Sequence, residues 1–427
     1  MSKLTAHLES GPGTGKSLRM ASVAWVLAAI YHFYQYALRS APSVMLPQLS
    51  QAFGVATLDV ASILGLFYYG SALFSLVAGV MMDRLGPRRV LPLAAAVVGV
   101  GAALFATGRS DVASVGRFLQ GAGGVFAPVG AIYIAANYFP SSRIATLVGA
   151  MQMFGMAGGS AGQFVVGPMI SGGLAWNRFW IGMSMAGLVM GVLLLAFLPK
   201  EKRTERRDGG LSSMIGPFRT VFGNPQSLLC GLIAGLLFIP TTIFDMVWGV
   251  RYLQEAHGLD YGSAVMRSAA VPFGWIVGCP LLGFISDRLG RRKPVIIGGA
   301  VVLVACLAWL LFGRIGVFPP YAIGLVAGLA SGAAMLPYTV IKEANPPQFG
   351  GTTTGVVNFL NFTFSALLGP FFGWILQYVS GGAAQMEHRH YQIAFAPMLL
   401  GVLAAIVLCL FLKETGPGPR ALPKRAI

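Results

Sequence analysis

Residues 79–90 read GVMMDRLGPRRV, and residues 283–294 read GFISDRLGRRKP. The two stretches lie 204 residues apart, and the same separation relates Gly70 to Gly274. Self-similarity at a fixed separation is how internal structural repeats show themselves in a sequence. The chain is therefore expected to consist of two halves that share one architecture.

The composition indicates that both halves lie in a membrane. Of the 427 residues, 56% are hydrophobic and only 10% are charged, whereas soluble domains carry about 25% charged residues. Twelve transmembrane spans of roughly 20 residues would require about this many apolar residues. We therefore expect an all-α membrane protein with twelve transmembrane helices. The expected spans are 22–47, 58–82, 89–108, 114–138, 145–170, 179–198, 227–253, 263–285, 294–313, 320–341, 352–378 and 392–412.

The chain has a net charge of +16, and its basic residues are distributed as the expected topology requires. With the N-terminus inside, 22 of the 30 lysines and arginines fall in inside segments and four in outside loops. This distribution obeys the positive-inside rule and predicts cytoplasmic termini. The basic excess therefore implies no nucleic-acid partner. The expected organisation is a tail (1–21), a six-helix bundle (22–198), a cytoplasmic central loop (199–226), a second six-helix bundle (227–412) and a tail (413–427).

Two motifs make the chain resemble a major facilitator superfamily transporter over essentially its whole length. The loop signature G-x-x-x-D-R-x-G-R-R is present at 79–89, with Pro87 where arginine is usual, and again at 283–292. A second signature, R-x-x-Q-G-x-G, runs from Arg117 to Gly123, and residues 135–149 resemble the loop that follows it. The resemblance implies two pseudo-symmetric bundles that alternate access to a central site, without ATP.

The loop signature has a physical interpretation of its own. Gly79 and Gly283 would let helices approach closely, and Asp83 would pair with nearby arginines when the cytoplasmic side is closed. The resemblance likewise implies a latch that stabilises the outward-open state. The alternative is a solvated charged loop. The expected latch residues are Gly79, Asp83, Arg84, Arg88, Asp287, Arg288 and Arg292.

Polar residues at helical spacing predict the substrate site. His32, Gln35, Tyr36 and Arg39 occupy one stripe of the first span, and a second stripe in the eleventh includes Asn358 and Asn361. Such residues face a cavity, or they hold helices together. In the seventh span Thr241, Asp245, Trp248 and Tyr252 share a face, and the tenth adds Tyr338 and Lys342. The predicted substrate-binding residues are Arg39, His32, Gln35, Tyr36, Trp248, Tyr338, Asn358 and Asn361.

Asp245 is the one acidic residue placed well inside a span, which makes it the candidate proton carrier. A fixed ion pair with Arg251 or Arg39 is the competing interpretation. Arg117 is assigned to proton coupling because its motif is associated with proton-coupled family members. Since embedded cations outnumber the embedded acid, an anionic substrate is favoured.

The first span also resembles the organophosphate and anion-cation symporter branches, in which an arginine at the place of Arg39 contacts the anion. Thr242 stands where phosphate exchangers have a second arginine, which counts against phosphate exchange. The antiporter signature around Gly167 and Pro168 is incomplete, with Gln163 at an expected glycine, which lowers the expectation of a drug/proton antiporter.

The sequence thus predicts a monomeric secondary transporter that moves a small organic anion, a carboxylate or similar, across a bacterial-type inner membrane, coupled to protons or a counter-solute. An exporter of drugs or metabolites and a transporter-like receptor are the alternatives. The stretch ESGPGTGKS at 9–17 lacks the first glycine and the preceding strand of a phosphate-binding loop. No enzyme activity and no cofactor are expected. No metal site is expected either, because the cysteines and histidines lack the spacing of metal ligands.

Overall fold

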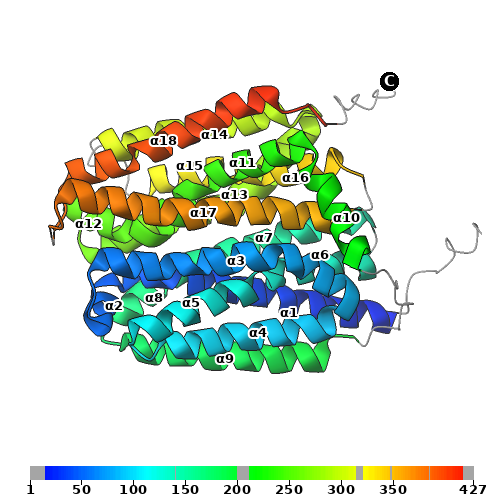
Figure 1. Cartoon of the computed structure of the whole chain (residues 1–427), viewed down its shortest axis with the longest axis horizontal. Helices are drawn as coiled ribbons and strands as arrows, with labels where there is room; N and C mark the ends of the chain where they lie inside the picture. The colour runs from blue at the N-terminus through cyan, green and yellow to red at the C-terminus, as the bar shows by residue number, and fades with distance from the viewer. Residues whose placement is uncertain are drawn as a thin grey trace, which may run out of the picture.

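The computed structural model describes residues 15–139, 141–199, 211–313, 321–346, 349–383 and 385–416. These residues form helices and no β-strand. Figure 1 shows the helices running alongside one another, with the first half of the chain in the lower layer and the second half in the upper layer. The all-α expectation is confirmed for the described part of the chain.

The first half contains nine α-helices and one 3₁₀ turn. They are α1 (Gly15–Ser40), η1 (Ala41–Val44), α2 (Leu46–Phe53), α3 (Thr57–Leu85), α4 (Pro87–Phe105), α5 (Ser110–Gly124), α6 (Phe126–Tyr138), α7 (Ser141–Phe164), α8 (Val166–Ser171) and α9 (Trp176–Phe197). The expected spans lie on these helices, but three of them are interrupted: the first at η1, the fourth between α5 and α6, and the fifth between α7 and α8. Pro42 causes the break at η1, because proline cannot donate the hydrogen bond that would continue α1.

The second half repeats the pattern and adds one unforeseen helix. Its elements are α10 (Leu211–Phe222), α11 (Pro225–Ile239), the π-helix η2 (Pro240–Gly249), α12 (Val250–His257), α13 (Tyr261–Leu289), α14 (Lys293–Phe312), α15 (Ala322–Ser331), η4 (Gly332–Met335), α16 (Leu336–Glu343), α17 (Gly350–Ser380) and α18 (His388–Phe411). The expectation of a loop throughout 199–226 is wrong, since α10 lies within it. Ten helices of the described chain are long and apolar enough to cross a membrane.

Equivalent glycines perform the same packing role in each half. A Cβ at Gly70 would lie 2.8 Å from the backbone nitrogen of Ala122 on α5, and one at Gly274 2.7 Å from that of Leu329 on α15. Glycine is therefore required where α3 crosses α5 and where α13 crosses α15. The expectation of close packing at Gly283 is wrong in this conformation, because an added Cβ would meet no described atom within 4 Å.

We expect Gly70→Ala and Gly274→Ala each to lower the stability of the folded protein by about 1–3 kcal/mol, the usual penalty for overpacking. Gly283→Ala is the matched control. It should be neutral or stabilising by up to about 1 kcal/mol, since alanine favours a helix over glycine. Thermal unfolding of the purified protein in detergent measures all three, and equal unfolding temperatures would contradict the packing assignment.

The two halves meet along two helix pairs, α3 with α17 and α7 with α13. Figure 1 shows α3 and α17 side by side at the boundary between the layers. We call the end of the molecule that carries residues 86–89 and 290–293 the basic end, and the end that carries η1 and Gly258 the opposite end.

Candidate functional site

A central cavity of about 790 Å³ lies between the two halves. It extends to Lys342 of α16, an exposed residue near the basic end. Both halves contribute polar and aromatic side chains to its wall. The lining includes His32, Gln35, Tyr36, Phe67, Ser71 and Gln152 from the first half, and Phe238, Tyr338, Lys342, Thr354, Asn358, Asn361 and Phe362 from the second.

The first half contributes a polar group centred on α1. The Gln35 Nε2 atom lies 3.2 Å from His32 Nδ1, and the His32 and Tyr36 rings meet edge to face at 5.0 Å between centroids. His32 Nε2 and Gln152 Nε2 are buried and form no well-aligned hydrogen bond, although the two side chains lie close enough to interact with each other. Buried polar atoms are nearly always paired, so these two atoms leave hydrogen-bonding capacity for a ligand.

The second half contributes a linked trio opposite this group. The Tyr338 hydroxyl donates to Asn358 Oδ1 at 2.8 Å and accepts from Asn361 Nδ2 at 3.2 Å. Asn361 Oδ1 has no partner. The trio offers amide and hydroxyl groups held in fixed positions, which suits a ligand that carries several hydroxyl groups.

Arg39 lies behind the inner wall of this cavity rather than among its lining residues. Its side chain is 4% exposed, and Nε donates to the Tyr68 hydroxyl at 3.2 Å. Arg39 forms no ion pair with any described acid, and its Nη2 has no partner. Its guanidinium carbon lies near four aromatic rings, at 4.9 Å from Tyr68, 5.0 Å from Tyr36, 5.8 Å from Phe362 and 6.0 Å from Phe67.

Arg117 on α5 is a second buried cation without a described acidic partner. Its Nη1 donates to the Leu38 carbonyl at 3.1 Å and to Gln120 Oε1 at 2.7 Å. The first bond ties α5 to the last turn of α1, whereas the second lies within α5. Arg117 does not line the cavity. Its predicted part in proton coupling stays a prediction.

The opposite end is closed by hydrogen bonds between the halves, which we call the seal. The Tyr68 hydroxyl donates to the Thr242 carbonyl at 2.7 Å, and the Tyr261 hydroxyl to the Val44 carbonyl at 2.7 Å. Gln163 Nε2 reaches the Asp245 carbonyl at 3.5 Å. The central cavity thus extends toward the basic end and is closed at the other.

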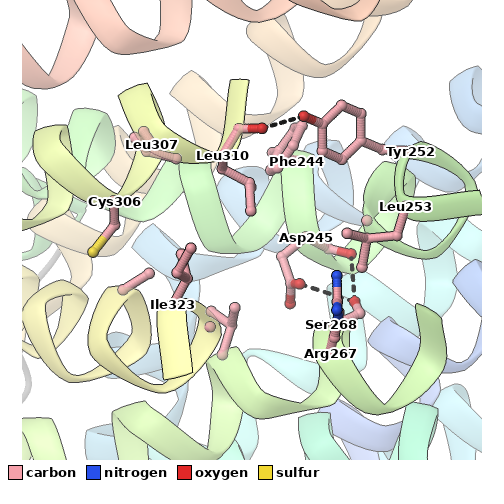
Figure 2. A pocket seen from close by; sticks show the side chains of 14 residues that line it. Phe244, Asp245, Tyr252, Leu253, Arg267, Ser268, Cys306, Leu307, Leu310 and Ile323 are labelled. Atoms are coloured by element: carbon pink, nitrogen blue, oxygen red, sulfur yellow. Dashed lines mark hydrogen bonds between the residues drawn. The ribbon is translucent and has the colours of Figure 1, made fainter. Parts of the chain in front are cut away.

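Asp245 and Trp248 lie away from the central cavity. Neither is among its lining residues, and Trp248 is fully buried in η2. Asp245 lines a second cavity inside the second half (Figure 2). In this conformation Arg251 pairs with Glu255 at 2.8 Å and the Asp245 carboxylate accepts from Ser268, so the competing interpretation of Asp245 as half of a fixed pair stays a prediction.

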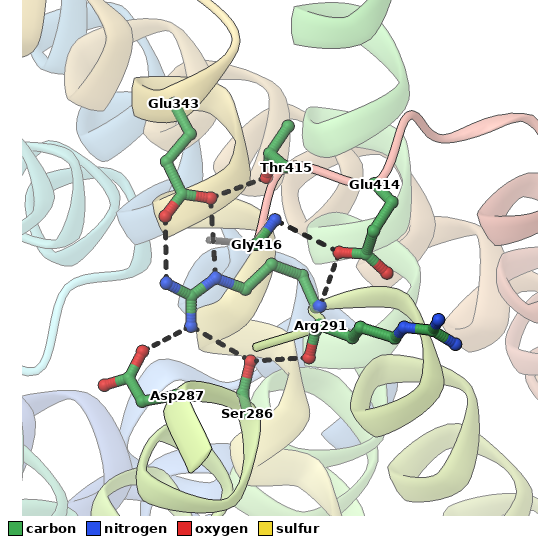
Figure 3. A network of polar contacts seen from close by, with 8 residues as sticks. Ser286, Asp287, Arg291, Glu343, Glu414, Thr415 and Gly416 are labelled. Carbon is green, nitrogen blue, oxygen red and sulfur yellow. Dashed lines mark hydrogen bonds and ion pairs between the residues drawn. The ribbon is translucent and has the colours of Figure 1, made fainter. Parts of the chain in front are cut away.

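Two of the predicted latch residues, Asp287 and Arg292, belong to a charged network in the second half, part of which Figure 3 shows. Arg292 pairs with Asp287 at 2.5 Å and with Glu343 at 2.9 Å, and it donates to the Ser286 hydroxyl at 3.0 Å. The Asp287–Arg292 pair is present although the cavity extends toward the basic end, so this pair does not require closure there. Glu343 was not anticipated from the loop motif.

The C-terminal segment after α18 completes this network. Glu414 accepts hydrogen bonds from the backbone N–H groups of Arg292, at 2.6 Å, and Lys293, at 3.2 Å. Thr415 donates to Glu343 at 2.5 Å. Although burial opposes it, these backbone hydrogen bonds lower the pKa of Glu414, so its carboxylate is charged near neutral pH.

The first copy of the motif is arranged differently. Arg88 Nη1 donates to the Leu198 carbonyl at the end of α9, at 2.7 Å, and Arg84 and Arg288 are exposed. A Cβ at Gly79 would lie 3.6 Å from the Gly351 carbonyl oxygen, so α3 and α17 are close there. The side chain of Asp83 lies outside the described residues. The latch in this half stays a prediction.

Six of the eight predicted substrate-binding residues line the central cavity, all except Arg39 and Trp248. Four further polar or aromatic lining residues were not predicted from the sequence: Phe67, Ser71, Gln152 and Phe362. Gln152 could have been found, because it is the one amide in the apolar stretch 147–158. The aromatic residues gave no such signal, since nothing in their spacing distinguishes a cavity wall from a packed core.

Two repeated helical halves that enclose a polar cavity, accessible toward one end and hydrogen-bonded shut at the other, define a multi-pass membrane transport protein. The family model "Major Facilitator Superfamily" matches residues 28–370. The chain therefore belongs to the major facilitator superfamily.

Relatives and solved structures are consistent with this assignment. The chain is 26% identical over 355 residues to the hexuronate transporter of Bacillus subtilis (strain 168), covering 78% of this chain and 82% of that protein. It is 25% identical over 363 residues to the enterobactin exporter EntS of Escherichia coli O127:H6 (strain E2348/69 / EPEC). This match covers 79% of this chain and 81% of that protein.

Two solved transporters share the fold. The inward-facing, occupied structure of a bacterial homologue of the human lysosomal transporter Spinster matches with a TM-score of 0.67 at 14% identity, over 92% of this chain and 96% of that one. A point mutant of the nucleoside transporter NupG matches with a TM-score of 0.71 at 13% identity, over 91% and 99%.

Proposed function

We propose that the protein is a secondary active transporter that moves a small hydroxylated organic anion, of the sugar-acid class, across a bacterial inner membrane by proton symport. The observation that carries the proposal is a polar cavity formed by both halves, with the unpaired guanidinium of Arg39 behind its inner wall. A buried charge without a counter-ion creates a strong local potential, because the surrounding dielectric is low. An anionic ligand compensates that charge.

The neutral lining residues support the hydroxylated part of this proposal. Atoms on His32, Gln152 and Asn361 that form no well-aligned hydrogen bond face one space with the Tyr338 hydroxyl, and they match ring hydroxyl groups. Tyr36, Phe67 and Phe362 provide apolar faces for the carbon skeleton. The relative named as a hexuronate transporter favours the same substrate class, since a hexuronate carries one carboxylate and several hydroxyls.

Alternating access would then move the substrate. By the positive-inside rule the basic end faces the cytoplasm, so this conformation is inward-facing. Opening the other end requires breaking the seal, including the Tyr68–Thr242 bond. The two halves would rock about the α3–α17 and α7–α13 pairs while the substrate stays in the cavity between them.

We expect proteoliposomes that contain the protein to accumulate labelled D-glucuronate when the outside is acidified, and not to accumulate D-glucose. Protein-free liposomes and a protonophore provide the controls. No glucuronate flux under either a proton or a substrate gradient would remove sugar acids as the substrate class. Binding without flux would instead support a receptor.

The export of a larger metabolite is the second candidate function, and the relatives named as enterobactin exporters favour it. Its test uses inverted membrane vesicles, in which an exporter accumulates its substrate. Accumulation of enterobactin there, with no glucuronate uptake in right-side-out vesicles, would replace the first proposal.

A further inference from the structure

A second cavity of about 610 Å³ lies within the second half, among η2, α12, α13, α14 and α15 (Figure 2). We call it the C-bundle cavity. Asp245 lines it and does not line the central cavity. We propose that Asp245 exchanges the coupling proton through the C-bundle cavity, so that proton and substrate use separate compartments. This inference rests on the proton coupling in the proposed function.

The carboxyl group of Asp245 has the geometry of a proton site. It is 5% exposed, and Oδ1 accepts from the Ser268 hydroxyl at 2.9 Å. Oδ2 has no hydrogen-bond partner. A carboxyl group held by one oxygen can add or release a proton on the other without breaking an existing bond. Figure 2 shows Asp245 and Ser268 at the side of the cavity opposite Cys306.

The other groups around the cavity favour a proton over a metal cation. The charged or titratable lining residues besides Asp245 are Arg267 on α13, Tyr252 on α12 and Cys306 on α14, and α15 contributes only apolar ones. Buried guanidinium nitrogens of Arg267 lack a hydrogen-bond partner, and this positive charge repels a metal cation. The described residues also hold no group of acids, histidines and cysteines suited to a metal.

Asp245 is also part of the seal through its backbone. Its backbone carbonyl accepts from Gln163 Nε2, and the same Gln163 nitrogen donates to Ser43 Oγ at 3.2 Å. Asp245 lies in the π-helix η2, a rare backbone form that occurs frequently at functional sites. A change of charge at Asp245 therefore acts on the contacts that close the opposite end.

The test labels Asp245 in the full-length protein in nanodiscs, with no substrate present. Dicyclohexylcarbodiimide adds to a protonated carboxyl group in an apolar site, and the product is located by peptide mass spectrometry. We expect modification of Asp245 in the wild type and its loss in Ala327→Phe. The added ring would fill part of the cavity and block the reagent, because the close-packed protein around the cavity leaves the ring no other space. Val326→Phe is the matched control, since the neighbouring Val326 is exposed and should label normally.

A maleimide and a substitution in the central cavity test which route the labelling reagent takes to Asp245. Prior reaction of Cys306 with a bulky maleimide should block labelling of Asp245, and Cys306→Ala should abolish that block. Val129→Trp, which fills part of the central cavity instead, should leave labelling intact. Unchanged labelling in both Ala327→Phe and the maleimide-treated protein, or a block by Val129→Trp, would overturn the separate route.

The transport measurement separates this inference from the proposed function. In proteoliposomes, Ala327→Phe should slow glucuronate uptake driven by a proton gradient, whereas Val326→Phe should not. If the wild type carries no glucuronate, the proposed function fails while the labelling result still decides the route. If glucuronate uptake is proton-driven and Ala327→Phe leaves its rate unchanged, the inference alone fails.

Discussion

Replacing Arg39 by glutamine should abolish glucuronate uptake and weaken glucuronate binding by at least about 100-fold, or about 2.7 kcal/mol. Arg39 is buried and has no described acidic partner, so a bound carboxylate would be its counter-ion. Glutamine keeps a hydrogen-bond donor for Tyr68. It removes the positive charge and the planar guanidinium group with its several N–H donors. Tryptophan-fluorescence titration with glucuronate measures the binding loss.

Two controls separate the charge from the packing. Arg39→Lys keeps the charge and loses the bidentate geometry, so we expect it to retain part of the affinity. Arg109→Gln removes an exposed arginine that pairs only with the neighbouring Asp111 and should bind as the wild type does. Unchanged affinity in a folded Arg39→Gln protein would show that Arg39 is not part of the anion site.

The structure explains why the prediction from the first span was right in part. Helical spacing places His32, Gln35 and Tyr36 on one face of α1, and all three line the cavity. Arg39 is one turn further, where α1 ends at Ser40. Its side chain packs among rings from α1, α3 and α17. Only the fold brings these elements together, so no spacing within one span could show this.

The seventh span shows a different limit of sequence reasoning. Asp245 and Trp248 share a face if the segment is an α-helix, and that face was expected to meet the substrate. Residues 240–249 instead form the π-helix η2, whose wider turn changes which residues share a face. Both side chains consequently lie away from the central cavity. The loop repeat, by contrast, correctly predicted a structural repeat, because glycines such as Gly70 and Gly274 meet the same demand in each half.

Loss of Arg292 should also lower the stability of the folded protein. We expect Arg292→Gln to destabilise the protein by about 1–3 kcal/mol, because it removes several hydrogen bonds to charged groups from a buried guanidinium, although solvent screens its partly exposed partners. Arg292 is buried and bonds to Asp287 and Glu343 together. The loss should appear as a lower temperature of thermal unfolding in detergent. Arg288→Gln, an exposed arginine of the same loop, should cost less than about 0.5 kcal/mol.

A double-mutant cycle tests whether the pair itself is responsible. Most of the cost of Arg292→Gln should come from Glu343 being left half-buried without its partner, so Glu343→Gln in the same chain should recover part of the stability. Asp287 is mostly exposed, and water can solvate it, so Asp287→Asn should recover much less. Additive losses for Arg292→Gln and Glu343→Gln would contradict a coupled pair. Coupling would instead show that the loop before α14 is tied to α16, the helix that carries Lys342 at the cavity's basic end.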